Sequence, residues 1–226
     1  MRRKITFCLL YLIAGGLSVD AQTSGFLTDN VTGSVYRAKM DASINGNPFF
    51  IDEWLPGVIT LRSGQKAEKY NLKLDVYSNE LLFQYEGNAL VVVNPVKEFV
   101  LRTNLGSSYL FRAGFLPVER NTENTFYQVL TDGPVTLLKL TRKIITERKE
   151  YNQAAVIKEF EASESYYIAK ANGGIEKIRK DKKNLLAAIN DADGSFAKWL
   201  EKKGLRCKSE EELVQAVTAY NNNQHK

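Results

Sequence analysis

The chain has few of the residues on which most catalytic and metal sites depend. Its only histidine among 226 residues is His225, beside the C-terminal Lys226, where a chain usually frays. That scarcity excludes Ser-His-Asp and Cys-His catalysis as well as histidine-rich zinc sites. The sequence also has no GxSxG motif and no glycine-rich phosphate loop. We therefore expect no metal and no cofactor, and an enzyme built on this chain would have to use carboxylates, lysine or tyrosine.

Cysteine is equally scarce, with only Cys8 and Cys207. Cys8 lies in an N-terminal apolar run that we expect to be removed, which would leave Cys207 without an internal partner. The domain must then be stabilised by its core alone. A lone exported cysteine can pair with another chain or act as a nucleophile, but a small buried residue near the start of a helix is the favoured interpretation of Cys207.

The N-terminus resembles a secretory signal peptide. Arg2, Arg3 and Lys4 precede an apolar run from Ile5 to Leu17, and Val19 and Ala21 occupy the small-residue positions before a cleavage site. The run is shorter than the roughly 20 residues that span a bilayer, and no later segment is apolar enough. We expect cleavage of residues 1–21 after Ala21, and a protein that is periplasmic, on the cell surface or secreted.

The charge that remains after cleavage is small. Residues 1–21 hold three basic residues and one acid, so the formal charge would fall from +5 to +3. A mild excess of this kind concerns solubility rather than recognition. We expect no nucleic acid as a partner.

Residues 22–47 are rich in Ser, Thr, Asn, Asp and Gly, and we expect a loosely ordered leader there. The pattern then becomes that of β-strands. Residues 70–77 (YNLKLDVY) alternate strictly, which predicts a strand with Tyr70, Leu72, Leu74 and Val76 buried and its other side wet. Further short strands are predicted at 58–62, 80–85, 89–93, 97–102, 108–112 and 126–130.

Turn residues separate these runs too closely for crossover helices. Neighbouring strands should therefore pair antiparallel. Residues 135–149 (VTLLKLTRKIITERK) indicate one long strand that continues past its partner, and 166–178 indicate a last hairpin with ANGG at its tip. Residues 48–180 thus predict an antiparallel meander sheet or a partly closed barrel.

Three short helices are predicted at 181–191, 195–204 and 209–221. Asp181 is the expected N-cap of the first and Gly204 the stop of the second, while Ser209 and Glu212 form a capping box at the third. Helices this short need packing to persist. We expect a helical tail, 181–222, docked on the β domain, with residues 223–226 frayed; the fold class is α+β, mainly β.

The stretch NPFFIDEWLPG, residues 47–57, holds adjacent carboxylates, Asp52 and Glu53. Two acids suggest glycoside hydrolysis. In an extended chain, however, successive side chains point to opposite faces, so these two cannot act on one substrate. Pro56 and Gly57 favour a sharp turn into the next strand. We interpret the stretch as a cover for one end of the sheet.

Two other patterns have ordinary explanations. NDADGSF (190–196) resembles half of a calcium loop, but Ile189 and Leu200 fill its two anchoring positions. We expect a helix linker with Asp193 or Ser195 as N-cap. The basic clusters 177–183 and 202–208 are typical of solvated faces, although they could meet phosphate groups or an acidic partner.

Aromatic residues are the remaining candidates for a ligand-binding face. The chain has eleven Tyr and eleven Phe, which could line a sugar- or peptide-binding surface, although tyrosine is also simply a good strand residue. The candidate ligand-binding residues are Trp54, Tyr77, Tyr85 and Tyr127.

Residues 45–221 resemble a group of exported bacterial proteins. The likeness rests on NPFFIDEWLPGVITLRSGQ, on YNLKLDVYSNELLF and on YYIAKANGGIEKIRKDKKNLLAAI with Tyr220 and Asn221 near the end. Members of the group carry a G-S-P-[YF]-x-x-[DE]-[FW]-x-x-G stretch, a Y-[DN]-x-Y-x-[DN] strand turn and a helical tail; Asn47 stands where serine is more usual. The resemblance implies export and this architecture, and it carries no activity or site residue.

These observations favour a non-catalytic binding or assembly module of the cell envelope, with an envelope protein or a glycan as partner. One alternative is a carboxylate-dependent glycan hydrolase, which needs two acids facing one cleft. Another is a lipid or small-ligand carrier, which needs an apolar cavity of several hundred Å³. The sequence leaves the oligomeric state open.

Overall fold

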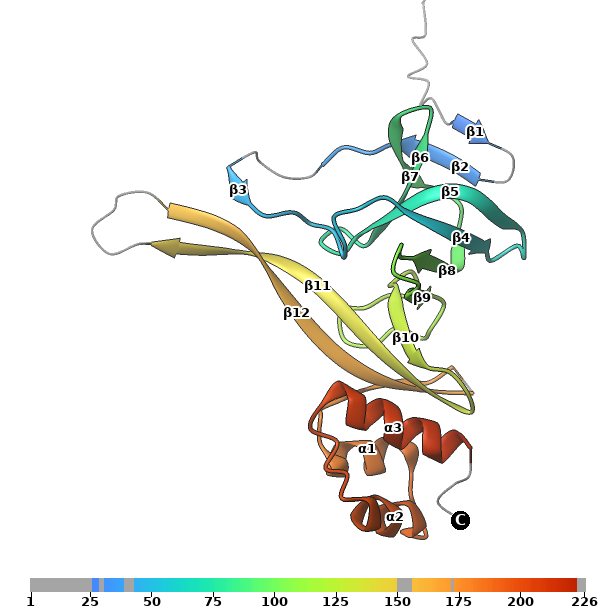
Figure 1. Cartoon of the computed structure of the whole chain (residues 1–226), viewed down its shortest axis with the longest axis vertical. Coiled ribbons are helices and arrows are strands. Elements are labelled where there is room, and N and C mark those ends of the chain that lie inside the picture. Colours follow the sequence, from blue (N-terminus) through green and yellow to red (C-terminus); the bar gives the residue numbers. More distant parts are fainter. Residues whose placement is uncertain (1–25, 29–30, 39–42, 150–155, 172, 223–226) are drawn as a thin grey trace, which may run out of the picture.

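The computed structural model describes residues 26–28, 31–38, 43–149, 156–171 and 173–222, which form one large sheet and three C-terminal helices (Figure 1). The strands are β1 (Phe26–Thr28), β2 (Val31–Val35), β3 (Ile44–Asn45), β4 (Leu55–Leu61), β5 (Lys66–Asp75), β6 (Glu80–Tyr85), β7 (Asn88–Val92), β8 (Val96–Arg102), β9 (Ser108–Arg112), β10 (Tyr127–Thr131), β11 (Val135–Lys149), β12 (Val156–Lys170) and β13 (Ile175–Ile178). The helices are α1 (Lys182–Ile189), α2 (Ser195–Lys203) and α3 (Glu210–Asn221). The predicted fold class, mainly β with three helices at the end, is confirmed.

The strand order is β1-β2-β7-β6-β5-β4-β8-β9-β10-β11-β12-β13. It is a meander with two jumps: from β2 the chain passes, by way of β3, to β4 on the far side of β5, and from β7 it returns on the far side of β4 as β8. All pairs are antiparallel except β3, which lies parallel to β12. In the described residues the order starts at β1 and stops at β13, so the sheet is open rather than closed on itself.

The longest feature is the ribbon of β11 and β12, which pair over fifteen residues each. On its other side β11 pairs with β10 only as far as Lys139. The ribbon therefore projects beyond the body of the sheet, as Figure 1 shows. The prediction of a long strand that continues past its partner is confirmed for 135–149.

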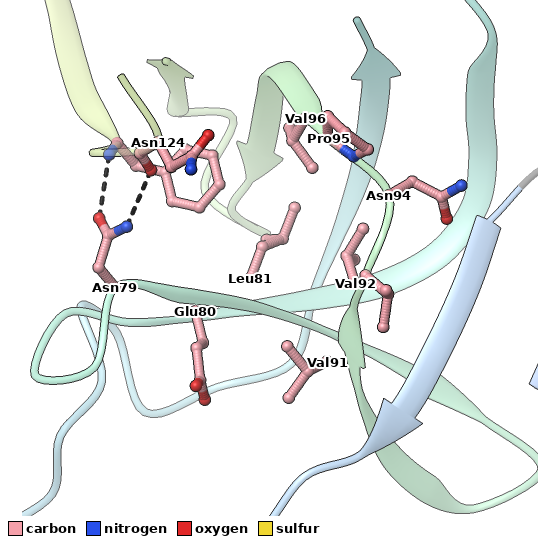
Figure 2. Close-up of a pocket in the computed structure, with 11 residues that line it drawn as sticks. Asn79, Glu80, Leu81, Val91, Val92, Asn94, Pro95, Val96 and Asn124 are labelled. Carbon is pink, nitrogen blue, oxygen red and sulfur yellow. Dashed lines mark hydrogen bonds between the residues drawn. The ribbon is translucent and has the colours of Figure 1, made fainter. Parts of the chain in front are cut away.

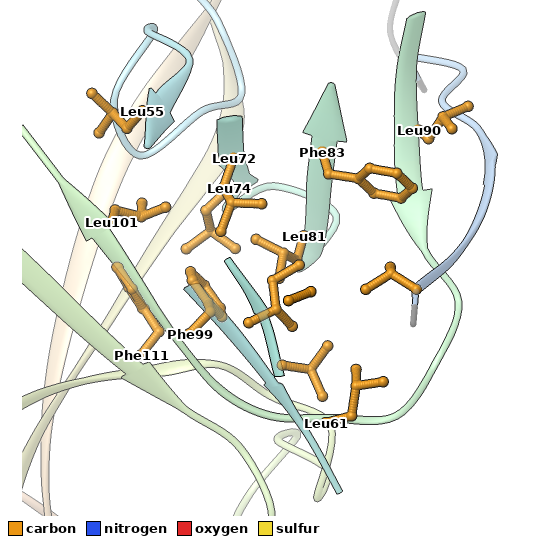
Figure 3. Packing of buried hydrophobic residues seen from close by; sticks show 14 of the residues in the cluster. Leu55, Leu61, Leu72, Leu74, Leu81, Phe83, Leu90, Phe99, Leu101 and Phe111 are labelled. Carbon is orange, nitrogen blue, oxygen red and sulfur yellow. The ribbon is translucent and has the colours of Figure 1, made fainter. Parts of the chain in front are cut away.

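Three clusters of buried side chains hold these parts together. One lies among β2 and β4 to β9 and contains Leu72, Phe83, Phe99 and Phe111 (Figure 3). A second joins the helices to β11–β13, and a third, around Tyr127 and Tyr167, also lies against this ribbon. The helical tail is thus docked on the end of the ribbon that lies nearest to it in sequence.

The leader predicted for 22–47 is more ordered than expected where it is described. β2 pairs with β7, and Val31 is buried. That pairing joins residues almost sixty positions apart, so no local pattern in the sequence reveals it. The strand β3 in the same segment pairs with β12. Residues 1–25 lie outside the described residues, as do 223–226.

The helix caps follow the sequence with one exception. The Asp181 side chain accepts the Asn184 N–H, the Ser209 side chain accepts the Glu212 N–H, and Gly204 ends α2 with φ of 69°. The predicted caps of α2, Asp193 or Ser195, were wrong. The N-cap is Gly194, and the Asp191 carboxylate accepts the N–H groups of Phe196 and Ala197 instead.

Candidate functional site

The stretch 47–54 crosses the end of β5 and covers it. Pro48 O accepts the Val76 N–H at 3.0 Å, and the Phe50 N–H donates to Leu74 O at 2.9 Å. The Asp52 carboxylate pairs with Lys73 at 2.9 Å, and both Asp52 and Glu53 are exposed. The interpretation of this stretch as a cover, and not as the lip of a carboxylate site, agrees with this placement.

The covered face of β5 contains two charged residues that the sequence pattern placed in water. Lys73 is 9% exposed and Asp75 2%, so the predicted wet face of this strand is wrong at its C-terminal end. The Lys73 ammonium lies 4.4 Å from the centre of the Phe49 ring, a favourable cation–π distance. The stretch 47–54 that buries these residues lies outside the strand in sequence. The alternation of residues within the strand therefore could not predict their burial.

The Asp75 carboxylate is the centre of a hydrogen-bonded turn. It accepts the hydroxyl of Tyr36 and the backbone N–H groups of Tyr77 and Ser78, each at 2.9 Å. Burial, with the hydrogen bond to Asp75, raises the pKa of Tyr36. Lys143 of β11 lies nearby and donates to the carbonyl of Asn47 at 2.9 Å. Burial lowers the pKa of Lys143, while the charges of Asp52 and Asp75 oppose that shift.

The four aromatic candidates do not form one site. Tyr127 is 1% exposed and packs against Tyr167, so its ring belongs to the core. Tyr85 is half-buried at the end of β6, and Trp54 lies 5.4 Å from the Lys73 ammonium. Tyr77 differs: it is 39% exposed and lines a hollow.

That hollow, which we name the edge groove, runs between the β5–β6 turn and β11. Its volume is about 350 Å³. The β5–β6 side contributes Leu74 and Val76–Asn79; Phe111 and Phe126 form part of the wall; β11 contributes Leu140–Ile144. Because β10 stops pairing with β11 at Lys139, these β11 residues are the first without a strand on that side in the described structure.

Two polar atoms of the edge groove are unusual. The hydroxyl oxygens of Ser78 and Thr141 are buried and have no hydrogen-bond partner within the described part of the chain. Buried polar groups are nearly always paired, and an unpaired one costs free energy. Beside them Ile144 exposes half of its apolar surface. The groove thus combines free hydroxyls, apolar surface and a strand edge.

A second hollow of about 230 Å³ lies next to the edge groove (Figure 2). Asn79 and Phe126 line both hollows. The Asn79 side chain donates to Asn124 O at 2.9 Å and accepts the Phe126 N–H at 3.0 Å, and Figure 2 shows it reaching across from the β5–β6 turn. This residue fixes the wall between the hollows, and its own φ is 58°.

Paired carboxylates occur at the joint between sheet and helices rather than in a hollow. The Tyr166 hydroxyl bonds to Glu210 at 2.7 Å and to Glu164 at 3.2 Å, and Lys139 lies 2.8 Å from Glu210. Burial raises the pKa of Tyr166, with a further contribution from the Glu210 hydrogen bond. Each hollow described above is lined by at most one carboxylate. No group of three or more His, Cys, Asp or Glu in the described residues could hold a metal.

Three residues of the edge groove were missed by sequence reasoning: Asn79, Thr141 and Ile144. Asn79 was assigned only to a turn, and the other two only to a long strand. The one useful signal was that 135–149 is longer than its neighbours, which predicts an unpaired stretch but not what faces it.

Comparison with protein families, curated proteins and solved structures finds no match to this chain. Its helices are also short: within the described residues, none has the length and apolar character needed to cross a membrane.

Proposed function

We propose that this protein is a non-catalytic binding module of the cell envelope, and that the edge groove with the free edge of β11 is its binding surface. One observation carries the proposal: from Leu140 to Lys149, β11 has a strand partner on one side only in the described structure. In an antiparallel sheet, alternate residues bond to each of the two neighbours. Half of the backbone groups over this stretch therefore face the open side.

An unpaired edge is a template for another strand, and an extended segment added to it gains backbone hydrogen bonds. Side-chain pockets beside the edge then give specificity. Here the groove offers the partly exposed side chains of Phe126 and Ile144, above the buried, unpaired hydroxyls of Ser78 and Thr141. An added segment with alternating apolar and polar residues fits this combination.

The charge of the edge indicates the character of the partner. The stretch 140–149 holds four basic residues, Arg142, Lys143, Arg148 and Lys149, against a single acid, Glu147. Opposite charge promotes encounter and fixes register. We propose an extended, acidic segment of an envelope protein as the partner. The distribution of carboxylates supports a binding role over hydrolysis, because neither the edge groove nor its neighbour holds two.

Replacing Ile144 tests this proposal, because the side chain is half exposed and lies on the open edge. The Ile144→Glu variant should fold, yet it would set a negative charge against an acidic segment. Leu105→Glu is the matched control, since Leu105 is 95% exposed in the β8–β9 turn. Tagged protein would be used to capture partners from solubilised envelopes, followed by hydrogen exchange on the complex.

We expect the wild type and Leu105→Glu to capture the same partner, and Ile144→Glu to lose it. In the complex, the amides of 140–149 should exchange more slowly. Absence of any reproducible partner, or a partner retained by Ile144→Glu, would overturn the proposal.

A further inference from the structure

A third hollow, on the ribbon of β11 and β12, has the composition of an anion site. It has a volume of about 280 Å³ and is lined mainly by cationic and hydroxyl side chains. We name this hollow the basic pocket. Its polar lining includes Arg120, Asn121, Arg142, Ser163, Ser165 and Lys177. Glu119 is the single carboxylate of the lining.

Strand pairing explains how these side chains meet. Arg142 of β11 is opposite Ser163 of β12, and Leu140 is opposite Ser165. Residues two apart on a strand share a face, as do cross-strand partners. The two serines and Arg142 therefore lie on one face of the ribbon. The loop that precedes β10 brings Arg120 and Asn121 to the same hollow.

The side chain of Arg142 is held in place by buried residues beneath the pocket. Its guanidinium donates to the Asn121 side-chain oxygen at 2.6 Å, and Asn121 in turn donates to the Tyr167 hydroxyl at 3.1 Å. Asn121 is 4% exposed and Tyr167 1%. A buried amide on a buried phenol is a rigid support, so Arg142 is oriented before any ligand arrives.

Most donors of the pocket are unused. Arginine carries five N–H donors, and within the described residues Arg142 gives a single one, to Asn121. Arg120 has no hydrogen bond or ion pair with any other described residue. Lys177 pairs with Glu119 at 3.0 Å. Three cations against one acid leave an excess of two positive charges in a hollow that also offers two hydroxyl groups.

We infer that the basic pocket binds a tetrahedral oxyanion, a phosphate or sulfate group with two negative charges. Arginine forks match such oxygens in a bidentate geometry, and serine hydroxyls supply further donors. The hollow is several times the roughly 30 Å³ that one water molecule occupies, which leaves space for the atoms that carry the group. The basic pocket shares Arg142 with the open edge of β11 but needs no added strand, and Arg120 lies outside that edge, so loss of binding in Arg120→Gln is distinguishable from failure of the proposed function.

Calorimetric titration of the purified protein with inorganic phosphate, inorganic sulfate, a hexose 6-phosphate and the neutral hexose tests the inference. Arg120→Gln is the main variant, because Arg120 is exposed and its replacement breaks no contact within the described structure. Arg142→Gln is the second. Arg102→Gln, an exposed arginine of β8 outside the pocket, is the matched control.

We expect saturable binding of the charged probes, none of the neutral hexose, and an affinity about tenfold lower in each pocket variant, the usual effect of losing a hydrogen bond to a charged group. Tighter binding of the hexose phosphate would identify a group carried on a larger ligand, and equal binding would identify the free ion. The inference is overturned if no charged probe binds saturably, or if Arg102→Gln lowers the affinity as much as Arg120→Gln.

Discussion

The side chain of Asn221, in the last turn of α3, pairs with the backbone of Val135 as a neighbouring strand would. Its oxygen accepts the Val135 N–H at 3.1 Å and its nitrogen donates to Val135 O at 2.7 Å. The nitrogen also lies 3.4 Å from Asp132 O. One amide thus joins the end of α3 to the first residue of the long ribbon, 86 positions earlier.

Replacement of Asn221 by alanine should therefore lower the free energy of unfolding. The N–H and C=O of the buried Val135 would lose their partners, and unpaired groups of this kind cost about 2 kcal/mol together. Urea unfolding followed by circular dichroism measures the change. Asn222→Ala, next to it and exposed, should change stability by less than about 0.5 kcal/mol. Equal effects of the two substitutions would show that the hydrogen bonds between Asn221 and Val135 contribute nothing to stability.

Gly57→Ala should be more disruptive, because the site has no space for a methyl group. A Cβ at this position would lie 2.5 Å from Leu72 Cδ1 and 2.5 Å from Val100 O, which belong to the two flanking strands. We expect a loss of about 3 kcal/mol, as for overpacked cores. Asn71→Ala, an exposed position on the neighbouring strand, is the control. A thermal melt of Gly57→Ala that matches the wild type would contradict this prediction.

The thiol of Cys207 should be inert in the folded protein. The residue is fully buried, and burial, with a smaller contribution from Glu212, raises its pKa to about 11. At pH 8 roughly a thousandth of such a thiol is ionised. Reaction with a disulfide reagent should be slow in buffer and fast in denaturant. Cys207→Ser is the control, because any labelling that remains in this variant comes from Cys8. Rapid labelling of the folded wild type that is lost in Cys207→Ser would contradict the prediction.

The ion pair of Arg112 and Asp132 should make stability depend on acid. The guanidinium bonds to both carboxylate oxygens, at 3.0 and 2.8 Å. This pairing lowers the pKa of Asp132 below its ordinary value. The contribution is complete above the unfolded-state pKa, about 3.9, and disappears as the pH falls through the lower folded-state value.

Asp132→Asn should therefore be less stable than the wild type at pH 7, by about 1 kcal/mol because the carboxylate is half exposed and screened. The difference should shrink below about pH 4. Denaturant unfolding of both proteins across this range measures it, with the exposed Glu68→Gln as control. A difference that stays constant down to pH 2 would rule out the ion pair as its source.

Local sequence patterns predicted much of the architecture. These patterns involve only a few adjacent residues: the alternation in 70–77, the turns between short apolar runs, and the caps at Asp181 and Ser209. The strands and helices that they predicted are present in the structure. Such features depend on the period of a strand or helix and on hydrogen bonds within one turn. A residue as isolated as Cys207 could also be assigned to the core from its type alone.

What the tertiary structure decided is where distant segments meet. Alternation placed Lys73 and Asp75 in water, but residues 47–54 cover them. The segment around Val31 looked unstructured because its partner strand, β7, is far along the chain. The edge groove and the basic pocket lie where the long strand β11 continues past its pairing with β10. The residue pattern of a strand does not depend on which distant strand it pairs with. Only the folded molecule therefore shows the pairing.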